Sequence, residues 1–372
     1  MRIGFMKPYS ILAVVQPGLE EIAQSELNAL GYCDLERMRG GFFLKGHQST
    51  VMRLNFCCRT LSRVLIGIAE FEARSFTQME KQLRDVPWQD YLNSQKLCIR
   101  VMSYQSELYH EKAIEERLID SLAQIMGRAV TVVGSPDEEG TQLISVYARH
   151  DRFTIRMDSS GAHLHKRGYG IHKEDAPLRE TLACAMLRSI GWNETVRHLC
   201  DPLCGSGTIP IEAALTAKNI PLSEFRSFAF QRWNCYQNEI EAKIRTELNA
   251  KIIDNPKVTI LASDRDEKAL ASALANAKQA GVEELIRFKQ AAFSKNNIDR
   301  IFDVITNPPW GVRLRAGSLA KLYNELSDLA ARGQNTYLIL PATQQQGFRH
   351  PYSVKLRFEA GGIKVKFIKL EA

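Results

Sequence analysis

The first part of the chain mixes the hydrophobic spacing of strands with that of helices. The stretch "YSILAVVQPGLEEIAQSELNALGY" predicts a strand, a turn and a helix. Its apolar residues recur at helical spacing after the turn, at Leu19, Ile22, Ala23, Leu27 and Leu30. The runs "GGFFLKG" and "SRVLIGIAEFEA" predict two more strands, and we expect a helix around residues 52–56. Residues 1–75 therefore predict a small α+β domain.

A second α+β pattern follows. The run "LCIRVMSY" predicts a strand, and a helix after it carries one apolar stripe of Ile114, Leu118, Leu122 and Ile125. The stretch "QLISVYARHDRFTIRMDSSG" alternates like a β-hairpin that turns near His150–Arg152. We place this second domain at residues 76–165.

From about residue 166 to residue 372 the pattern changes to alternating strands and helices. The predicted strands are "VRHLCD", "VTILASD", "LIRFKQAAF", "FDVITNPP", "NTYLILPA" and "IKVKFIKL". Helices are expected from about Pro177, from about Thr208, over 267–280 and over 318–331. Elements that alternate at this length favour a doubly wound, mostly parallel sheet. Such sheets bind ligands at the carboxyl ends of their strands, so unusual residues at strand ends are candidate site residues.

The first unusual strand end is "LCDPLCGSGTIPIEAAL". The strand ends at Asp201, and glycines at 205 and 207 allow a ligand to approach the backbone closely. The helix that follows carries Pro210 in its first turn, where proline is tolerated. Its N-terminal N–H groups suit an anionic group such as a single carboxylate. There is no GxxxxGK[ST] phosphate loop, and Pro210 stands where GxGxxG needs a glycine. The alternative is a tight turn that binds nothing.

The next strand ends on Asp264, and Asp266 follows two residues later. A carboxylate at this place can accept hydrogen bonds from both hydroxyl groups of a ribose. The alternative is that both aspartates cap the following helix. The position about sixty residues after the glycine turn favours the ribose.

The stretch "FDVITNPPWG" ends a later strand on Asn307, two prolines and Trp310. The prolines fix two φ angles and remove two backbone donors. The Asn307 side-chain oxygen and the Pro308 carbonyl can accept hydrogen bonds from the exocyclic amine of a nucleobase and draw its nitrogen toward tetrahedral geometry. Trp310 offers a face on which an extruded base can stack, typically worth ~1–3 kcal/mol. The alternative is a rigid structural turn.

The composition is that of a globular protein, and the charge is consistent with binding to a polyanion. Apolar residues make up 45% and charged residues 24% of the 372 positions. The net charge of +7 is uneven, with +1 over residues 1–170 and +6 over residues 171–372. Basic residues gather at 152–173 and 349–369, which indicates a nucleic acid or a solvated basic surface. No apolar run reaches the ~18 residues of a membrane span. The eight cysteines lack CxxC spacing, so we expect buried free thiols in the cytoplasm and no metal site.

Taken together, these motifs resemble the THUMP-domain class I RNA methyltransferases. The resemblance runs through "PGLEEIAQSEL", "CCRTLSRVL", "SYQSELYHEKAIEERLIDSL", "LHKRGYG", "APLRETLACAML", "DPLCGSGTIPIEAAL", "FAFQRW" and "NPPWG". It implies an α/β, Rossmann-like methyltransferase domain at 166–372, a doubly wound sheet whose last strand is antiparallel. That domain would follow a ferredoxin-like domain at 1–75 and a THUMP RNA-binding domain at 76–165. It also implies S-adenosylmethionine as cofactor and RNA as partner, in a monomer without an obligate protein partner.

The resemblance assigns site residues by their matching positions. Cofactor binding would involve Leu178, Arg179, Asp201, Cys204, Gly205, Ser206, Gly207, Thr208, Asp264 and Ala292, and the target-base pocket would comprise Asn307, Pro308, Pro309 and Trp310. Three features, at four positions, depart from the family pattern. Ala291 and Ala292 stand where an acidic residue usually reads the adenine amine, so backbone groups would have to read it. Trp310 often is Tyr in the family, and Gly170 often is Arg.

The resemblance implies methylation of guanine N2, with 23S ribosomal RNA as the leading substrate. Transfer RNA is the close alternative, because surface shape decides between the two. A DNA adenine-N6 methyltransferase would fit "NPPW" alone, but the N-terminal RNA-binding region argues against it. From another class, the protein could be an RNA-binding factor without catalysis, which only the alanine at 292 supports.

Overall fold

The structure, a computed structural model of the chain, describes residues 8–93, 96–170, 178–192, 197–293, 298–310, 316–343, 348 and 350–371. The chain folds into two compact units that alternate along the sequence. The first comprises the described residues of Met1–Val15, Tyr32–Leu164 and Arg226–Thr246, and the second those of Gln16–Gly31, His165–Phe225 and Glu247–Ala372. The domain boundaries expected after residues 75 and 165 stay a prediction.

The first unit is built on one eight-stranded sheet with the strand order β2-β3-β1-β4-β8-β7-β5-β6. Its strands are β1 (Tyr9–Val15), β2 (Glu36–Met38), β3 (Gly41–Gly46), β4 (Leu61–Glu72), β5 (Lys96–Tyr104), β6 (Thr131–Val132), β7 (Gln142–Arg149) and β8 (Arg152–Asp158). The long strand β4 pairs with β1 on one side and with β8 on the other. The two α+β patterns of the sequence therefore share one sheet.

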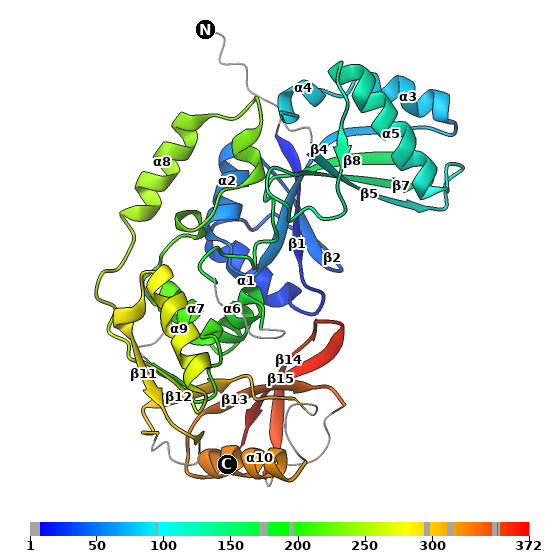
Figure 1. The fold of residues 1–372 in the computed structure, drawn as a ribbon. Coiled ribbons are helices and arrows are strands. Elements are labelled where there is room, and N and C mark those ends of the chain that lie inside the picture. Colours follow the sequence, from blue (N-terminus) through cyan, green and yellow to red (C-terminus); the bar gives the residue numbers. More distant parts are fainter. Residues whose placement is uncertain are drawn as a thin grey trace. The chain divides into compact units, whose positions relative to one another are not determined.

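The helices of this unit are α2 (Gln48–Cys57), α3 (Phe76–Arg84), α4 (Trp88–Tyr91) and α5 (Glu111–Met126), with the short 3-10 helix η2 (Ala229–Arg232). Figure 1 shows α3 and α5 on the same face of the sheet part formed by β5, β7 and β8. The predicted stripe of α5 buries Ile114, Leu118 and Leu122. The predicted hairpin turns at His150 and Asp151, which both have positive φ angles. The sequence did not predict α3 and α4.

The second unit contains a seven-stranded sheet with the order β11-β10-β9-β12-β13-β15-β14. The strands are β9 (His198–Asp201), β10 (Ile260–Asp264), β11 (Ile286–Gln290), β12 (Phe302–Thr306), β13 (Thr336–Pro341), β14 (Tyr352–Ala360) and β15 (Ile363–Leu370). The first five strands in this order are parallel, and β15 runs antiparallel between β13 and β14. This confirms the doubly wound sheet with an antiparallel last strand, while β14 was not predicted.

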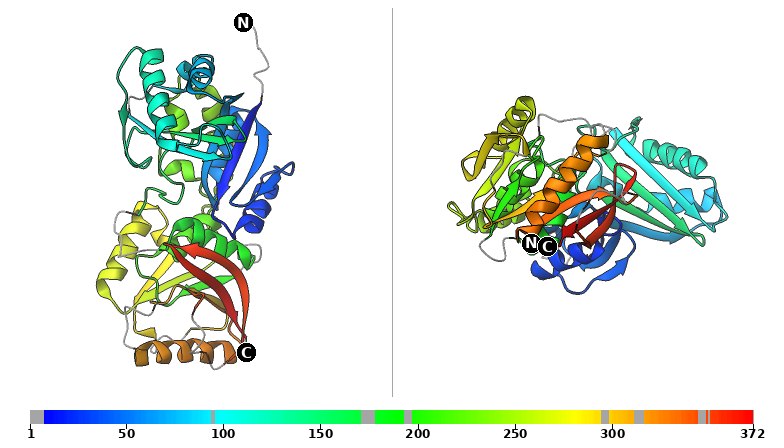
Figure 2. Two further views of the ribbon diagram at one scale, coloured as in Figure 1. Left: turned by 90° about the vertical axis from the view of Figure 1, so that its right-hand side faces the viewer. Right: turned by 90° about the horizontal axis from the view of Figure 1, so that it is seen from below.

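Helices cover both faces of this sheet. The helices of this unit are α1 (Glu20–Ala29), which packs against α6, and α6 (Glu180–Ser189), α7 (Thr208–Ala217), α9 (Glu267–Gln279) and α10 (Ala316–Ala331), with the 3-10 helices η1 (Leu222–Glu224) and η3 (Glu283–Leu285). In Figures 1 and 2, α6, α7 and α9 lie on one face and α10 lies on the opposite face. Helix α6 begins at Glu180, whereas we expected a start near Pro177, which lies outside the described residues.

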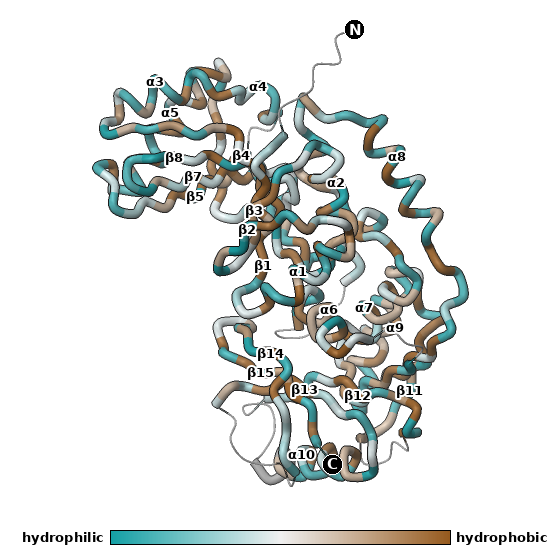
Figure 3. The backbone as a smooth tube through the Cα atoms, turned by 180° about the vertical axis from the view of Figure 1, so that it is seen from behind, coloured by the Kyte–Doolittle hydropathy of each residue, from teal (hydrophilic) through white to brown (hydrophobic). Residues whose placement is uncertain are grey.

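Helix α8 (Asn238–Asn249) spans the change from the first unit to the second. The sequence did not predict it. Hydrophilic residues dominate along α8, and hydrophobic ones occur only at intervals (Figure 3). Of its side chains only Glu241 and Ile244 are buried, so its apolar stripe is narrow.

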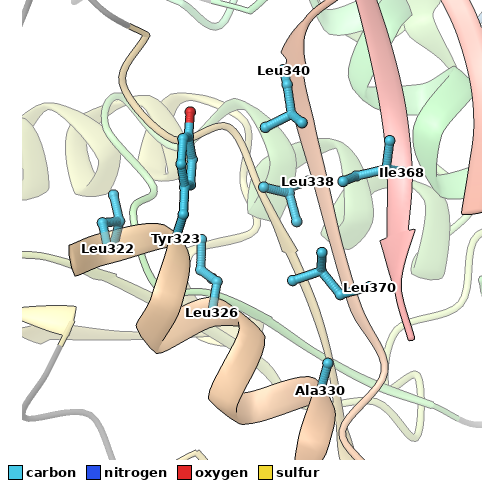
Figure 4. Packing of buried hydrophobic residues seen from close by; sticks show 8 residues of the cluster. All are labelled: Leu322, Tyr323, Leu326, Ala330, Leu338, Leu340, Ile368 and Leu370. Atoms are coloured by element: carbon cyan, nitrogen blue, oxygen red, sulfur yellow. The ribbon is translucent and has the colours of Figure 1, made fainter. Parts of the chain in front are cut away.

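An apolar cluster fixes α10 against the sheet (Figure 4). The helix contributes Leu322, Tyr323, Leu326 and Ala330, and β13 and β15 contribute Leu338, Leu340, Ile368 and Leu370. Every member is at most 9% exposed. Full burial of a leucine side chain stabilises by about 1.5–3 kcal/mol, so this cluster holds β13 firmly beside β12, whose end carries the NPPW motif.

Arg167 corrects one expectation about the basic segment 152–173. Its guanidinium is fully buried, and Nε donates a hydrogen bond to Oε1 of Glu212 at 3.3 Å. The hydroxyl of Tyr169 donates to the same oxygen at 2.8 Å, and burial raises the pKa of Tyr169. Arg167 therefore joins the segment before α6 to α7, so the expectation that the basic residues of 152–173 face a nucleic acid or solvent is wrong for this residue.

The cysteines are free thiols, as expected, and five of them are buried: Cys58, Cys98, Cys184, Cys200 and Cys204. Cys33 is exposed, so the expectation of burial is wrong there. Within the described ranges, no helix has both the length and the apolar character needed to span a membrane.

Candidate functional site

The glycine turn joins β9 to α7 with two residues in left-handed backbone conformations. Gly205 has φ of 52° and Gly207 has φ of 87°, which favour glycine strongly. The turn is tied to β10 because the N–H of Cys204 donates to the Ser263 carbonyl at 3.0 Å. The first N–H groups of α7 have no partner within the helix, so they are available to an anionic group in front of the turn.

Close packing also requires glycine at position 207. A Cβ atom there would lie 3.0 Å from the Cβ and 3.2 Å from the Cα of Ala273 on α9. The carbonyl of Ser206 accepts a hydrogen bond from the Asn276 side chain at 3.1 Å. Helix α9 therefore supports the back of the turn, and the turn's other side is left for a ligand.

The two aspartates after β10 have different roles. Asp266 is exposed, and its side chain accepts a hydrogen bond from the Lys268 N–H, so it caps α9. Asp264 is half-buried and does not cap the helix in this way. Its Oδ2 accepts from the Gly205 N–H and its Oδ1 from the Asp266 N–H, each at 3.0 Å. Each oxygen keeps a further lone pair, so the carboxylate can still accept two hydroxyl groups.

The NPPW motif lies directly after β12, at the carboxyl end of the strand next to β9. Pro308 is buried, and Pro309 and Trp310 are half-buried. The Oδ1 atom of Asn307 is buried and accepts no hydrogen bond from the described residues, and the same holds for Trp310 Nε1 as a donor. An unmade hydrogen bond of a buried polar group costs about 1–3 kcal/mol, so these two atoms are candidates for contacts with a ligand.

A hydrogen bond links the two strand ends. Thr306 Oγ1 donates to Oδ1 of Asp201 at 2.7 Å, and the N–H of Leu203 donates to the same oxygen at 3.2 Å. Burial raises the pKa of Asp201 to about 7, the two hydrogen bonds act against this rise, and the charge of Asp264 adds to it. Asp201 therefore ionises near neutral pH, at the base of the glycine turn.

The remaining expected residues lie on neighbouring elements. Leu178 is buried and Arg179 is exposed, and they stand immediately before α6, which packs against α7. Ala291 and Ala292 follow β11, and the Ala291 N–H donates to the Asp264 carbonyl at 3.0 Å. Cys204 and Ser206 are buried within the turn and Thr208 begins α7. Their roles toward a cofactor stay predictions.

Sequence reasoning missed Thr306 and Asn276. Thr306 completes an apolar strand pattern, where a β-branched residue is ordinary, so nothing marks it. Asn276 is 3% exposed in the middle of α9, and a polar residue on the buried side of a helix is the signal that could have found it.

The strand order and the glycine turn define a Rossmann-like α/β fold. Residues 167–358 match the family model UPF0020, described as the RMKL-like methyltransferase domain. Residues 10–65 match the RlmL ferredoxin-like domain. The chain belongs to the UPF0020 family of RMKL-like methyltransferases.

Similar proteins cover nearly the whole chain. YpsC of Bacillus subtilis (strain 168), whose name assigns it RNA methyltransferase activity provisionally, is 30% identical over 359 residues, which are 94% of this chain and 91% of YpsC. The ribosomal RNA large subunit methyltransferase K/L of Syntrophotalea carbinolica is 30% identical over 341 residues. That match covers 86% of this chain, and the chain spans 47% of that relative's length.

A solved structure has the same fold. The crystal structure of SMU.472, named provisionally as a methyltransferase and complexed with SAH, matches with a TM-score of 0.81 at 25% identity over 99% of both chains. Family membership and this neighbour confirm the prediction of S-adenosylmethionine as the methyl donor of such a domain. The THUMP assignment of residues 76–165 stays a prediction.

Proposed function

We propose that the protein transfers a methyl group from S-adenosylmethionine to the N2 amine of a guanine in RNA, and that the RNA is 23S ribosomal RNA. One observation carries this proposal. The Asn307 side chain keeps a buried oxygen acceptor without a partner among the described residues, at the strand end next to the glycine turn. An amine that must lose a proton as it is methylated needs such an acceptor.

The residues of the turn fit the proposed cofactor. The N-terminus of α7 suits the carboxylate of the methionine part, and the glycines at 205 and 207 let that part approach the backbone. The half-buried Asp264 carboxylate has acceptor capacity for the ribose hydroxyls. Backbone groups near Ala292 would read the adenine, because no acidic side chain stands there. When bound, this cofactor supplies an electrophilic methyl group on a positively charged sulfur.

The NPPW residues would prepare the target amine. Asn307 Oδ1 and the Pro308 carbonyl would accept hydrogen bonds from its two N–H groups, which directs the nitrogen lone pair toward the methyl group that the cofactor supplies. The lone pair would take up this methyl group, the electron pair of the S–C bond would stay on the cofactor's sulfur, and one amine proton would pass to water. Trp310 holds the extruded base by stacking, which is worth ~1–3 kcal/mol. Proline at both middle positions adds no competing N–H donor.

An open sheet face of the first unit supports RNA as the substrate. Residues that pair directly across neighbouring strands point to the same side of a sheet. Rows of paired residues across β5, β7 and β8 therefore form this face. The rows contain Arg100, Met102, Tyr104, Tyr147, Arg149, Arg152 and Arg156. The alternate residues of β7 and β8, among them Ile144, Val146 and Ile155, are buried, so these rows lie on the more exposed face of the strands.

The chemistry of this sheet face suits single-stranded RNA. Met102 is 63% and Tyr104 53% exposed, which is unusual for such large apolar side chains on a strand. The guanidinium of Arg149 lies 5.9 Å from the centre of the Tyr104 ring. Flat side chains flanked by arginines bind unstacked bases and the phosphates between them. One arginine, Arg152, already pairs with Glu70, so the local excess of positive charge is modest.

Similarity to the K/L enzyme supports ribosomal RNA over transfer RNA. We expect the protein to act in the cytoplasm, where this RNA is made. The test is transfer of labelled methyl groups by the purified protein to separated 23S ribosomal RNA, transfer RNA and DNA, each from cells that lack the protein. The proposal expects label in 23S ribosomal RNA. Label confined to transfer RNA would change the substrate, and label in DNA alone would refute the proposal.

A further inference from the structure

Thr306 and Asp201 occupy equivalent places on neighbouring strands. Thr306 is the last residue of β12 and stands directly before Asn307, and Asp201 is the last residue of β9 and stands directly before the glycine turn. The hydroxyl of Thr306 donates to the Asp201 carboxylate at 2.7 Å. Both residues are buried, at 0% and 2% exposure. The backbones of β9 and β12 already pair as neighbouring strands, and this side-chain bond adds a direct link between the residue before the base pocket and the residue before the cofactor turn.

We propose that Thr306 is a positioning residue that holds the Asp201 carboxylate in its ionised form and thereby favours the positively charged methyl donor over its uncharged product. The inference rests on the proposed function, because the donor must bind in the turn that follows Asp201. S-adenosylmethionine carries one more positive charge than S-adenosylhomocysteine, on its sulfur. A buried carboxylate near that charge discriminates between the two, whereas a protonated carboxyl does not.

The surroundings of Asp201 make its charge depend on the donated bond. From β12 it receives the Thr306 hydroxyl, from the turn the Leu203 N–H, and from β10 it faces the negative charge of Asp264. Burial disfavours its ionised form and places its titration near neutral pH. A hydrogen bond to a charged group stabilises the ionised form, so without the Thr306 hydroxyl the titration moves upward by about one pH unit or more.

The experiment compares calorimetric affinities for S-adenosylmethionine and S-adenosylhomocysteine between pH 6 and pH 9. In the wild type, the ratio of the two affinities should shift toward the methyl donor as pH rises through about 7, and then level off. In T306V this midpoint should move up by about one pH unit, which lowers the preference by about fivefold at the wild-type midpoint. T306S should restore the wild-type profile. The ligand's own amine titrates equally with every variant, so the difference between variants reports on the protein.

Thr336→Val is the matched control. Thr336 is also 0% exposed in the same sheet, but its hydroxyl donates to the Gln334 carbonyl and to no ionisable group. This variant should keep the wild-type midpoint. A second readout needs no ligand: the loss of unfolding free energy in T306V should grow between pH 5 and pH 8, while that in T336V stays constant. A pH-independent loss in T306V, or an unmoved midpoint, would overturn the inference.

Asp201→Asn covers the case in which T306V fails to fold. Its side chain carries no charge at any of these pH values, so the affinity ratio should vary less with pH than in the wild type. A ratio that still rises through pH 7 as in the wild type would refute the role of Asp201. If the wild-type protein binds neither ligand, the proposed function fails. If it binds both with no pH dependence in the ratio, this inference alone fails.

Discussion

The backbone N–H of Gly205 donates a hydrogen bond to Oδ2 of Asp264 at 3.0 Å, across 59 residues of sequence. The turn that follows β9 and the acidic residue that ends β10 are therefore one structural piece. One lone pair of this Asp264 oxygen accepts the Gly205 N–H and so fixes the turn to the end of β10. The other lone pairs of the carboxylate are then held in a fixed direction for a ligand.

Asp264 and Asp266 form a matched pair of carboxylates for mutation. Asp264→Ala should weaken S-adenosylmethionine binding by ~1.5–3 kcal/mol, the scale of hydrogen bonds to a charged group. Asp266→Ala removes only the cap of α9 and should cost about 0.5–2 kcal/mol of unfolding free energy with little change in affinity. Calorimetry and urea unfolding measure the two quantities. An affinity loss confined to Asp266→Ala would mean that Asp266, and not Asp264, binds the ribose of the cofactor.

Gly207 needs glycine both for its positive φ angle and for its close packing, and a second glycine with a positive φ angle but no close neighbour separates the two effects. Gly281 also has a positive φ, of 63°, but a Cβ there would meet nothing within 4 Å. Gly281→Ala should cost only the left-handed strain, about 1–2 kcal/mol, and leave cofactor affinity unchanged. Gly207→Ala must also displace Ala273, so urea unfolding should show a larger loss, and cofactor binding should weaken. Equal losses in the two variants would show that packing against α9 is unimportant.

Variants of Asn307 and Trp310 should distinguish an effect on the methylation rate from an effect on binding of the target base. Asn307→Ala should lower the single-turnover methylation rate by about 10²-fold or more, as when one transition-state acceptor or donor is removed, and barely change cofactor affinity. Trp310→Ala should lose both RNA affinity and rate, whereas Trp310→Tyr keeps an aromatic face and should retain much of the activity. Normal single-turnover rates in Asn307→Ala would leave the motif as a structural turn.

The open sheet face predicts which surface residues contact RNA. Tyr104→Ala should weaken RNA binding by ~1–3 kcal/mol through lost stacking. Arg149→Ala should reduce the slope of affinity against salt by ~0.7, the value for one phosphate contact to a single strand. Tyr109→Ala and Arg128→Ala are the controls, because both residues are exposed outside the strand rows. Equal effects of controls and test variants would place the RNA elsewhere.

Local sequence patterns predicted most of the second unit because most of its strands are short apolar runs that alternate with helices along the chain. The ends of β9 and β10 were predicted to the residue, since each run stops at an aspartate, whereas β12 ends at Thr306, one residue before the predicted end at Asn307. The strand β14 was missed because "YSVKLRFEA" breaks its alternation where the register with β15 shifts, between Val354 and Leu356. Periodicity cannot detect such a bulge.

Features that depend on the order of strands could not be read from the sequence. The bond from Thr306 to Asp201 exists because β12 lies beside β9, although 105 residues separate the two. Arg167 illustrates the same limit for charge. A basic run predicts a polyanion partner, but one of its members is buried against Glu212, a residue on a helix much later in the chain.

The identity of the methylated nucleoside tests the central claim most directly. Ribosomal RNA from cells that lack the protein is incubated with the purified protein and S-adenosylmethionine, digested to nucleosides and measured by mass spectrometry. The Asn307→Ala variant serves as the control for contaminating activity. We predict new N2-methylguanosine that depends on the wild-type protein. New N6-methyladenosine in its place, or no methylated nucleoside at all, would contradict the account.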